Sequence, residues 1–300
     1  MSAFVSTFIQ GLSYRGREGH LSYLGHRLAG LGTLLFLAIH ILDTSTVYFF
    51  PSLYSHAIAI YRSTPFMLGE ILLVAAVIFH GVNGLKIILC DLFPNWWTKT
   101  SERQSFWRVA GLTVVLWVPA AYFMGRSLYL NNICQCPPPA SGPVDVTAPL
   151  IGIAVAFVIV LGVLAFGGSL NQAAAGSTRA VAVPTRNLET WAWLFMRWSG
   201  ALLVPLAWGH ILIQDVLVGV HAITLDYVAL RWATPAWRLY DIALLAFAFG
   251  HGVNGLRGIV NDYVQHPGWN RAIKWAMLVG WVAITAIGAV AIIRGVGVPK

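Results

Sequence analysis

The stretch His-Gly-Val-Asn-Gly-Leu occurs twice in this chain, at residues 80–85 and again at residues 251–256. A neutral imidazole carries one nitrogen lone pair that can bind a metal ion or accept a proton. Both stretches lie deep in apolar sequence, where a polar side chain is costly and indicates a function. Two further histidines, His40 and His210, have similarly apolar surroundings. These four histidines are the first candidates for a site.

The two halves of the chain align over much more than this stretch. The offset between matching residues is 170 in the first part and 171 further along. The matched polar positions are Arg27 with Arg197, His40 with His210, Glu70 with Asp241, His80 with His251, and Asp91 with Asp262. A repeat of this length predicts one unit of three helices that is used twice.

The composition places these residues in a membrane. Of the 300 residues, 58% are hydrophobic and 10% are charged, and the mean hydropathy is +0.71. This balance excludes a water-soluble globular protein and predicts an all-α membrane protein. Seven apolar segments are long enough to cross a hydrocarbon layer of about 30 Å. They are 28–50, 66–91, 107–127, 147–168, 198–220, 236–260 and 273–293.

Basic residues flank these segments unevenly, which predicts the orientation of the chain. With a cytoplasmic N-terminus, most of the 19 basic residues fall on the cytoplasmic side, as the positive-inside rule requires. The net charge of +8 then reflects the orientation of a multi-pass protein among the lipids of the cell inner (cytoplasmic) membrane. No basic run indicates binding to nucleic acid.

The fourth segment has no counterpart in the repeat. A second unit of three helices that followed directly would cross the membrane in the opposite direction, so an extra helix is needed to return the chain. We therefore predict two parallel three-helix repeats, related by a pseudo-twofold axis along the membrane normal. The expected parts are a cytoplasmic segment at 1–25, the first repeat at 26–128, a linker with its own transmembrane helix at 129–190, and the second repeat at 191–300.

The repeat symmetry gives the four histidines a joint role. Equivalent residues lie at equal depth, so we expect His40 to face His210 and His80 to face His251 across the axis. Two neutral imidazoles on opposing helices are the axial ligand set of a b-type haem, and helical bundles hold such cofactors in their interior. Polar packing is the alternative for any single histidine. A zinc site would need closer ligands, usually with cysteine among them.

Two more features follow the second-helix histidines. Gly84 and Gly255 come four residues later, about 40° around the helix, and either leave room for a planar ligand or allow close helix packing. Asp91 and Asp262 come eleven residues later, on the same face at the cytoplasmic helix ends. An acid there opposes the helix dipole, which favours a functional role.

These residues resemble the membrane-anchor cytochrome b subunits of succinate:quinone and quinol:fumarate oxidoreductases. The stretch HRLAG at 26–30 is similar to the H-R-x-[ST]-G motif of the C anchor, with alanine in place of the small hydroxyl residue. The stretch 80–84 together with Asp91 resembles the second helix of that anchor. Asp262-Tyr263 resembles the pair that the D anchor presents near the quinone. The resemblance covers both repeats but not the linker helix, and it implies a fused C plus D anchor.

The resemblance implies that the chain anchors a succinate dehydrogenase. One-haem members use the pair that corresponds to His80 and His251, and His40 with His210 supplies a second pair. Two haem b groups are therefore expected, and one at minimum. The implied partners are an FAD-containing flavoprotein subunit and an iron–sulfur subunit, which pass electrons to ubiquinone or menaquinone. The chain has no dinucleotide fingerprint and no cluster-type cysteine spacing, so it cannot oxidise succinate alone.

The quinone is expected at the cytoplasmic end of the bundle. Arg27 and Asp262-Tyr263 should converge there, with Asp91 at the same depth in the other copy. A phenol can donate a hydrogen bond to a quinone carbonyl, and an arginine stabilises the negative charge that develops on reduction. Ser22 is a second candidate donor, although it lies five residues before Arg27 and Tyr23 occupies the position four residues before it.

Two other classes of protein stay open from the sequence. One is a stand-alone diheme carrier of the cytochrome b561 type, against which the Arg27 motif and Asp262-Tyr263 speak. The other is a non-haem proton-coupled transporter in which the histidines relay protons.

The remaining acids and the cysteines are less informative. Glu70 and Asp241 are expected toward the outer side, at an outer quinone site, in proton movement, near haem propionates, or in ion pairs with the arginines of the outer rim, Arg62, Arg231 and Arg238. Cys134 and Cys136 form a CxC in a loop, and Cys90 lies near an inner helix end. We expect incidental thiols and no disulfide framework.

Overall fold

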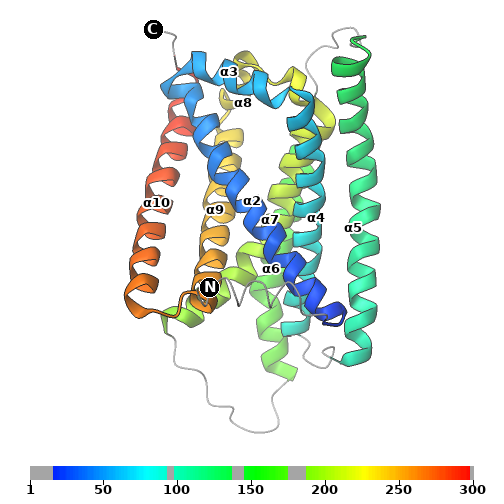
Figure 1. Cartoon of the computed structure of the whole chain (residues 1–300), viewed down its shortest axis with the longest axis vertical. Helices are drawn as coiled ribbons and strands as arrows, with labels where there is room; N and C mark the ends of the chain where they lie inside the picture. The colour runs from blue at the N-terminus through cyan, green and yellow to red at the C-terminus, as the bar shows by residue number, and fades with distance from the viewer. Residues whose placement is uncertain (1–15, 93–97, 137–144, 175–186, 298–300) are drawn as a thin grey trace, which may run out of the picture.

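Long helices joined by short helical connections make up the fold, with no strand in residues 16–92, 98–136, 145–174 and 187–297. These are the residues that the structure, a computed structural model, describes (Figure 1). Seven helices are long and apolar enough to cross a membrane. The predicted all-α membrane protein with seven such helices is confirmed.

The helices follow the order of the two repeats. The first repeat contains α2 (Glu18–Phe49), α3 (Pro51–Tyr61), α4 (Thr64–Leu92) and α5 (Lys99–Leu128), which continues into the π-helix η2 (Tyr129–Ile133). The extra helix is α6 (Thr147–Ala174). The second repeat contains α7 (Leu188–Ile211), the π-helix η3 (Leu212–Val218), the short 3-10 helix η4 (Val220–Ala222), α8 (Leu225–Trp232), α9 (Pro235–Tyr263) and α10 (Pro267–Arg294).

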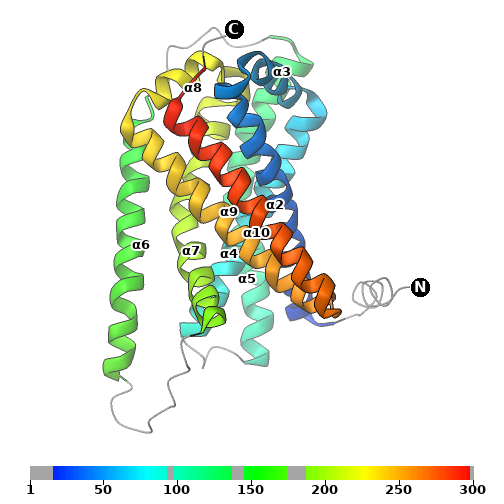
Figure 2. The same cartoon turned by 90° about the vertical axis from the view of Figure 1, so that its left-hand side faces the viewer.

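Equivalent helices of the two repeats run in the same direction (Figure 1). In that view α2 and α7 ascend, α4 and α9 descend, and α5 and α10 ascend again. Helix α6 descends along the edge of the molecule (Figure 2). It thereby returns the chain to the end where α7 begins.

Four helices form a closed core. Helix α2 packs on α4, α4 on α7, α7 on α9, and α9 on α2. The other long helices lie outside this ring, with α5 against α4, α10 against α9 and α2, and α6 against α7. The core helices are those that carry the four intramembrane histidines, so the packing places these histidines in the interior.

The two ends of this core differ in structure. The proximal end is where α2 and α7 begin and where α4 and α9 finish; the distal end carries the short helices α3 and α8 (Figure 1). These two helices have 11 and 8 residues and were not predicted. They are too short to span a bilayer, and a search for long apolar segments passes over them.

Helix α2 starts earlier than its predicted segment. It begins at Glu18 rather than near residue 28, because the polar turns EGHLSYLGHR continue the helix without a breaker. Ser22, Tyr23, His26 and Arg27 therefore lie on the same continuous helix as His40, and their directions around the helix are fixed.

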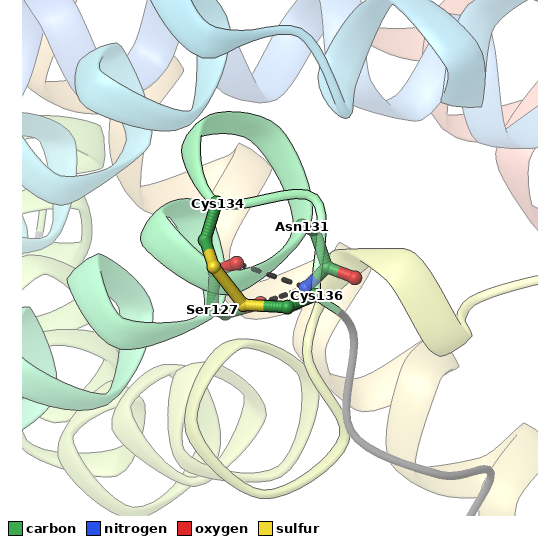
Figure 3. Close-up of a disulfide and its surroundings, with 4 residues drawn as sticks. All are labelled: Ser127, Asn131, Cys134 and Cys136. Atoms are coloured by element: carbon green, nitrogen blue, oxygen red, sulfur yellow. Dashed lines mark hydrogen bonds between the residues drawn. A yellow bond between two sulfur atoms is a disulfide. The ribbon is translucent and has the colours of Figure 1, made fainter.

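Cys134 and Cys136 form a disulfide at the distal end, so the expectation of incidental thiols is wrong for this pair (Figure 3). They follow η2, where Asn131 Nδ2 donates to the carbonyl oxygen of Ser127 at 2.9 Å. Cys90 is a free, buried thiol, as expected.

Candidate functional site

The proximal histidine pair joins the second helices of the two repeats. His80 on α4 and His251 on α9 have ring centroids 6.2 Å apart and planes at 87° to each other. A metal ion such as Zn²⁺ binds an imidazole nitrogen at about 2 Å, which separates the centroids of two opposing rings by roughly 6 Å. The spacing therefore fits one metal ion between the two rings.

Hydrogen bonds fix which nitrogen of each proximal ring is free. His80 Nδ1 lies 3.0 Å from the carbonyl oxygen of His26, which can only accept, so Nδ1 carries the proton. His251 Nδ1 lies 2.8 Å from Ser199 Oγ, which donates its own proton to the Phe195 carbonyl. Ser199 must then accept from His251. Both rings keep an Nε2 lone pair, as metal-binding histidines do.

Two glycines allow the proximal rings to lie against the first helices. A Cβ atom at Gly30 would lie 2.8 Å from His80 Cε1, and one at Gly200 would lie 3.3 Å from His251 Cε1. The first distance is shorter than real Cβ contacts. The alignment of the repeats matches these glycines, but only the packing of α2 on α4 and of α7 on α9 shows what they contact.

A side chain of the first helix lies beside each of Gly84 and Gly255. A Cβ atom at Gly84 would lie 3.6 Å from Cε1 of His26, and one at Gly255 would lie 3.7 Å from Cε of Met196. His26 and Met196 are equivalent positions, so each repeat places a first-helix side chain over its second-helix glycine. Spacing along one helix could not show what the neighbouring helix contributes.

His26 begins the HRLAG stretch, but the sequence alone did not indicate its contact with the proximal pair. Its ring stacks on that of His80, with centroids 3.9 Å apart and planes at 5°. Its Nδ1 atom is buried and has no hydrogen-bond partner in the described part of the chain. An unsatisfied buried polar atom costs about 1–3 kcal/mol, so a polar group of a bound cofactor fits beside it.

The distal histidine pair joins the first helices of the two repeats. His40 on α2 and His210 on α7 have ring centroids 6.2 Å apart and planes at 81°. Phe36 stacks on His40 at 5.4 Å. Among the described residues, His210 Nδ1 is buried without a partner. The distal pair thus has the spacing of the proximal pair but lacks the hydrogen bond that orients His251.

Two ion pairs connect the repeats at the proximal end. Arg27 on α2 pairs with Asp262 on α9, and Arg197 on α7 pairs with Asp91 on α4 at 2.7 Å. Each arginine also lies over an aromatic ring of its own helix. The Cζ-to-centroid distance is 4.3 Å from Arg27 to Tyr23 and 4.4 Å from Arg197 to Trp193. These contacts hold both guanidinium groups in place.

The Arg27 cluster is richer in hydroxyl groups than the Arg197 cluster. Tyr23 has Arg27, Asp262 and Tyr263 as electrostatic neighbours. The residue that corresponds to Tyr263 in the first repeat is Leu92. The Asp262 side chain is 50% exposed, so the cluster is open to a ligand from the bilayer or the interface. The structure brings the predicted residues together and adds Tyr23.

Ser22 belongs to a different cluster from Arg27. It is buried, donates to Asn83 Oδ1 at 2.7 Å and accepts from Lys86 Nζ at 3.1 Å. A hydroxyl has one proton, and here Asn83 accepts the one that Ser22 carries. Ser22 lies five residues before Arg27 and faces the bundle interior, and its role as a quinone donor stays a prediction.

The distal acids find different partners. Asp241 accepts from Arg231 and, at 2.8 Å, from Trp232 Nε1. Tyr61 donates to Asp43 at 2.6 Å. Burial first, and this hydrogen bond second, raise the pKa of the Tyr61 phenol, which therefore stays protonated as the donor. Of the predicted ion pairs with outer arginines, the structure contains the one between Asp241 and Arg231.

The sequence of the chain is similar to known proteins. The family described as succinate dehydrogenase/fumarate reductase transmembrane subunit matches residues 12–120 and 177–292. The succinate dehydrogenase 2 membrane subunit SdhC of Mycobacterium tuberculosis (strain ATCC 25618 / H37Rv) is 34% identical over 116 residues, which are 39% of this chain and 84% of that protein. The two matched segments lie on either side of residues 121–176, which include α6.

Proposed function

Because the chain belongs to the family of succinate dehydrogenase/fumarate reductase transmembrane subunits, we propose that it is the haem-carrying anchor that passes electrons to a quinone. The observation that carries this proposal is the presence of two histidine pairs, His80 with His251 and His40 with His210. Each pair contains one histidine from each repeat, and the ring centroids of each pair are 6.2 Å apart. Haem b bound between such rings supplies one-electron chemistry within the bilayer.

His80 and His251 would hold the proximal iron, and His40 and His210 would hold the distal iron. The protonated Nδ1 atoms of the proximal pair orient both rings and raise the basicity of Nε2. His26 supports this assignment, because its orphaned Nδ1 lies beside the proximal pair, where a polar edge of the cofactor can satisfy it. Gly84 and Gly255 have no side chain, so the second helices allow close packing next to the same pair.

The quinone binds at the Arg27 cluster. Tyr263 and Tyr23 can donate hydrogen bonds to its carbonyl oxygens, and Arg27 stabilises the negative charge that develops there. Asp262 holds Arg27 and can pass protons to the reduced quinone. Asp91 has the equivalent place in the Arg197 cluster, where Leu92 replaces the phenol, so we assign it a structural ion pair.

The soluble partners are a flavoprotein with FAD and an iron–sulfur subunit, which dock at the proximal end. This places the proximal end on the cytoplasmic side of the inner membrane, in agreement with the charge distribution of the sequence. The Arg27 cluster lies at this end, so a quinone bound there would be close to the docked iron–sulfur subunit.

Purification in mild detergent through a tag on this chain tests the proposal. We expect an FAD-containing subunit and an iron–sulfur subunit to co-purify, and a reduced-minus-oxidised spectrum of haem b. Tyr263→Phe and Arg27→Leu should depress quinone reduction but leave the haem content and succinate oxidation by an artificial acceptor intact. A chain that carries haem but no flavoprotein would indicate a stand-alone electron carrier, and a chain without haem would indicate a transporter.

A further inference from the structure

Two acids at the distal end lack the partners that neighbouring acids have. Glu70 on α4 and Asp215 in η3 line one small cavity and are close enough for their charges to interact. Neither carboxyl group has a basic partner or a hydrogen-bond donor among the described residues. Asp241 is the repeat equivalent of Glu70, and it differs because Arg231 and Trp232 bind it.

Nearby arginines do not neutralise this acid pair. Arg62 donates from Nε to the carbonyl oxygen of Val220 at 3.3 Å and from Nη2 to that of Ile223 at 2.8 Å. Two carboxylates that face one small cavity disfavour each other's ionised form, because each raises the free energy of the other. A proton or a small metal ion bound between the two groups would remove this repulsion.

The cavity favours the proton. The cavity has a volume of about 10 Å³, which is enough for one water molecule. Apart from the two acids and Ser127, its lining includes Met67 and Met124, whose thioethers are poor ligands for hard cations. Such cations take about six or more oxygen ligands. No group of three metal-binding side chains occurs in the described part of the chain.

The backbone around the cavity is unusual. Asp215 lies inside the π-helix η3, and Ser127 lies just before the π-helix η2. Short π-helical segments within long helices often mark functional sites. In the second repeat, the η3 turn gives Asp215 its place opposite Glu70, and the first repeat has no acid at the corresponding position.

We propose that Glu70 and Asp215 form a proton-binding site, in which the two carboxyl groups and one water molecule share a single exchangeable proton. One carboxyl group is then neutral and donates through the water, and the other is ionised and accepts. The site carries a net charge of minus one, and Ser127 can donate to the ionised group. This role goes beyond electron transfer and does not depend on it.

Infrared spectroscopy of the purified complex in H2O and D2O tests the proposal. We expect the carbonyl band of a buried, protonated carboxyl group, which shifts in D2O. Glu70→Gln and Asp215→Asn should each remove or shift this band. Asp241→Asn is the matched control and should leave it unchanged, because Asp241 lies outside this cavity and is paired with Arg231. Ser127→Ala should move the band without removing it.

Two results would overturn the proton-binding site. One is a spectrum without a protonated carboxyl band, or with a band that ignores both substitutions. The other is a band that appears only when sodium is replaced by a bulky organic cation, which would identify a metal-ion site. Size-exclusion chromatography of each purified variant serves as the check on folding. Should either acid variant fail to assemble, an unmoved band in Ser127→Ala would overturn the proposal by itself.

Discussion

The proximal end of the core is built the same way twice, whereas the distal end is not. Both proximal histidines have an Nδ1 partner, and both proximal arginines pair with an aspartate of the other repeat. At the distal end, His210 Nδ1 has no partner in the described chain. Asp241 has an arginine there, whereas its equivalent Glu70 faces another acid.

This difference separates the positions that hold the repeats together from those that have diverged. The cross-repeat contacts at the proximal end link each first helix to the second helix of the other copy, so both copies must keep them. The distal end is closed by α3 and α8, whose sequences differ. The equivalent acids there also have different neighbours, Arg231 for Asp241 and Asp215 for Glu70. The function of the distal acids therefore has to be inferred from their contacts rather than from symmetry.

Removal of a histidine from each end gives the largest expected effect. His80→Ala should lose the proximal haem and keep the distal one, and His40→Ala should do the reverse. The haem-to-protein ratio and the resolved redox potentials of the two haems measure this. His56→Ala is the control, since His56 is exposed on α3 and should keep both haems. Loss of both haems from either variant would contradict independent sites.

The ion pairs at the two ends should contribute differently to the free energy of unfolding. The side chains of Arg231 and Asp241 are only 9% and 11% exposed, so Arg231→Leu leaves a buried charge alone and should cost about 3–5 kcal/mol. Arg27→Leu breaks a pair that is half exposed at Asp262 and should cost about 1 kcal/mol or less. Thermal unfolding of the complex in detergent compares them. Equal losses would refute the contrast in burial.

Substitution of Ser199 tests the importance of its hydrogen bond with His251, which has no counterpart at His210 among the described residues. Ser199→Ala removes the acceptor for His251 Nδ1 and should weaken proximal haem binding about 10–100-fold. The distal haem should be unaffected and acts as the internal reference in a haem-release titration. An equal effect on both haems would mean that Ser199 acts through the packing of α7.

Tyr23 offers the smallest and most specific test. Tyr23→Phe keeps a ring under Arg27 but removes its hydroxyl, so the KM for quinone should rise about fivefold, the value of one hydrogen bond. Trp193→Phe makes the matching change under Arg197 and should leave the KM unchanged. If both variants behave alike, Tyr23 only supports its arginine.

The sequence predicted the features that depend on periodicity and symmetry. Seven apolar segments became seven spanning helices, and equal offsets brought His80 to His251 and Arg27 to Asp262, because equivalent residues share a depth. These predictions needed only helix geometry and a repeat.

Features that depend on neighbouring helices could not be read from the sequence. The ring of His26 fills the space at Gly84 because α2 crosses α4 there, and no spacing on α4 encodes that contact. The burial of Ser22 depends on Asn83 and Lys86 of another helix. The CxC disulfide depends on a residue at positive φ, Gln135, whose conformation no local pattern predicted.

Pyridine haemochrome analysis of the purified parental chain tests the central claim most directly, because it counts haem b against protein without reference to any partner or quinone. The two histidine pairs with the same ring spacing predict two haems per chain. A ratio of one would reduce the distal pair to a packing contact, and a ratio of zero would contradict the account of both pairs.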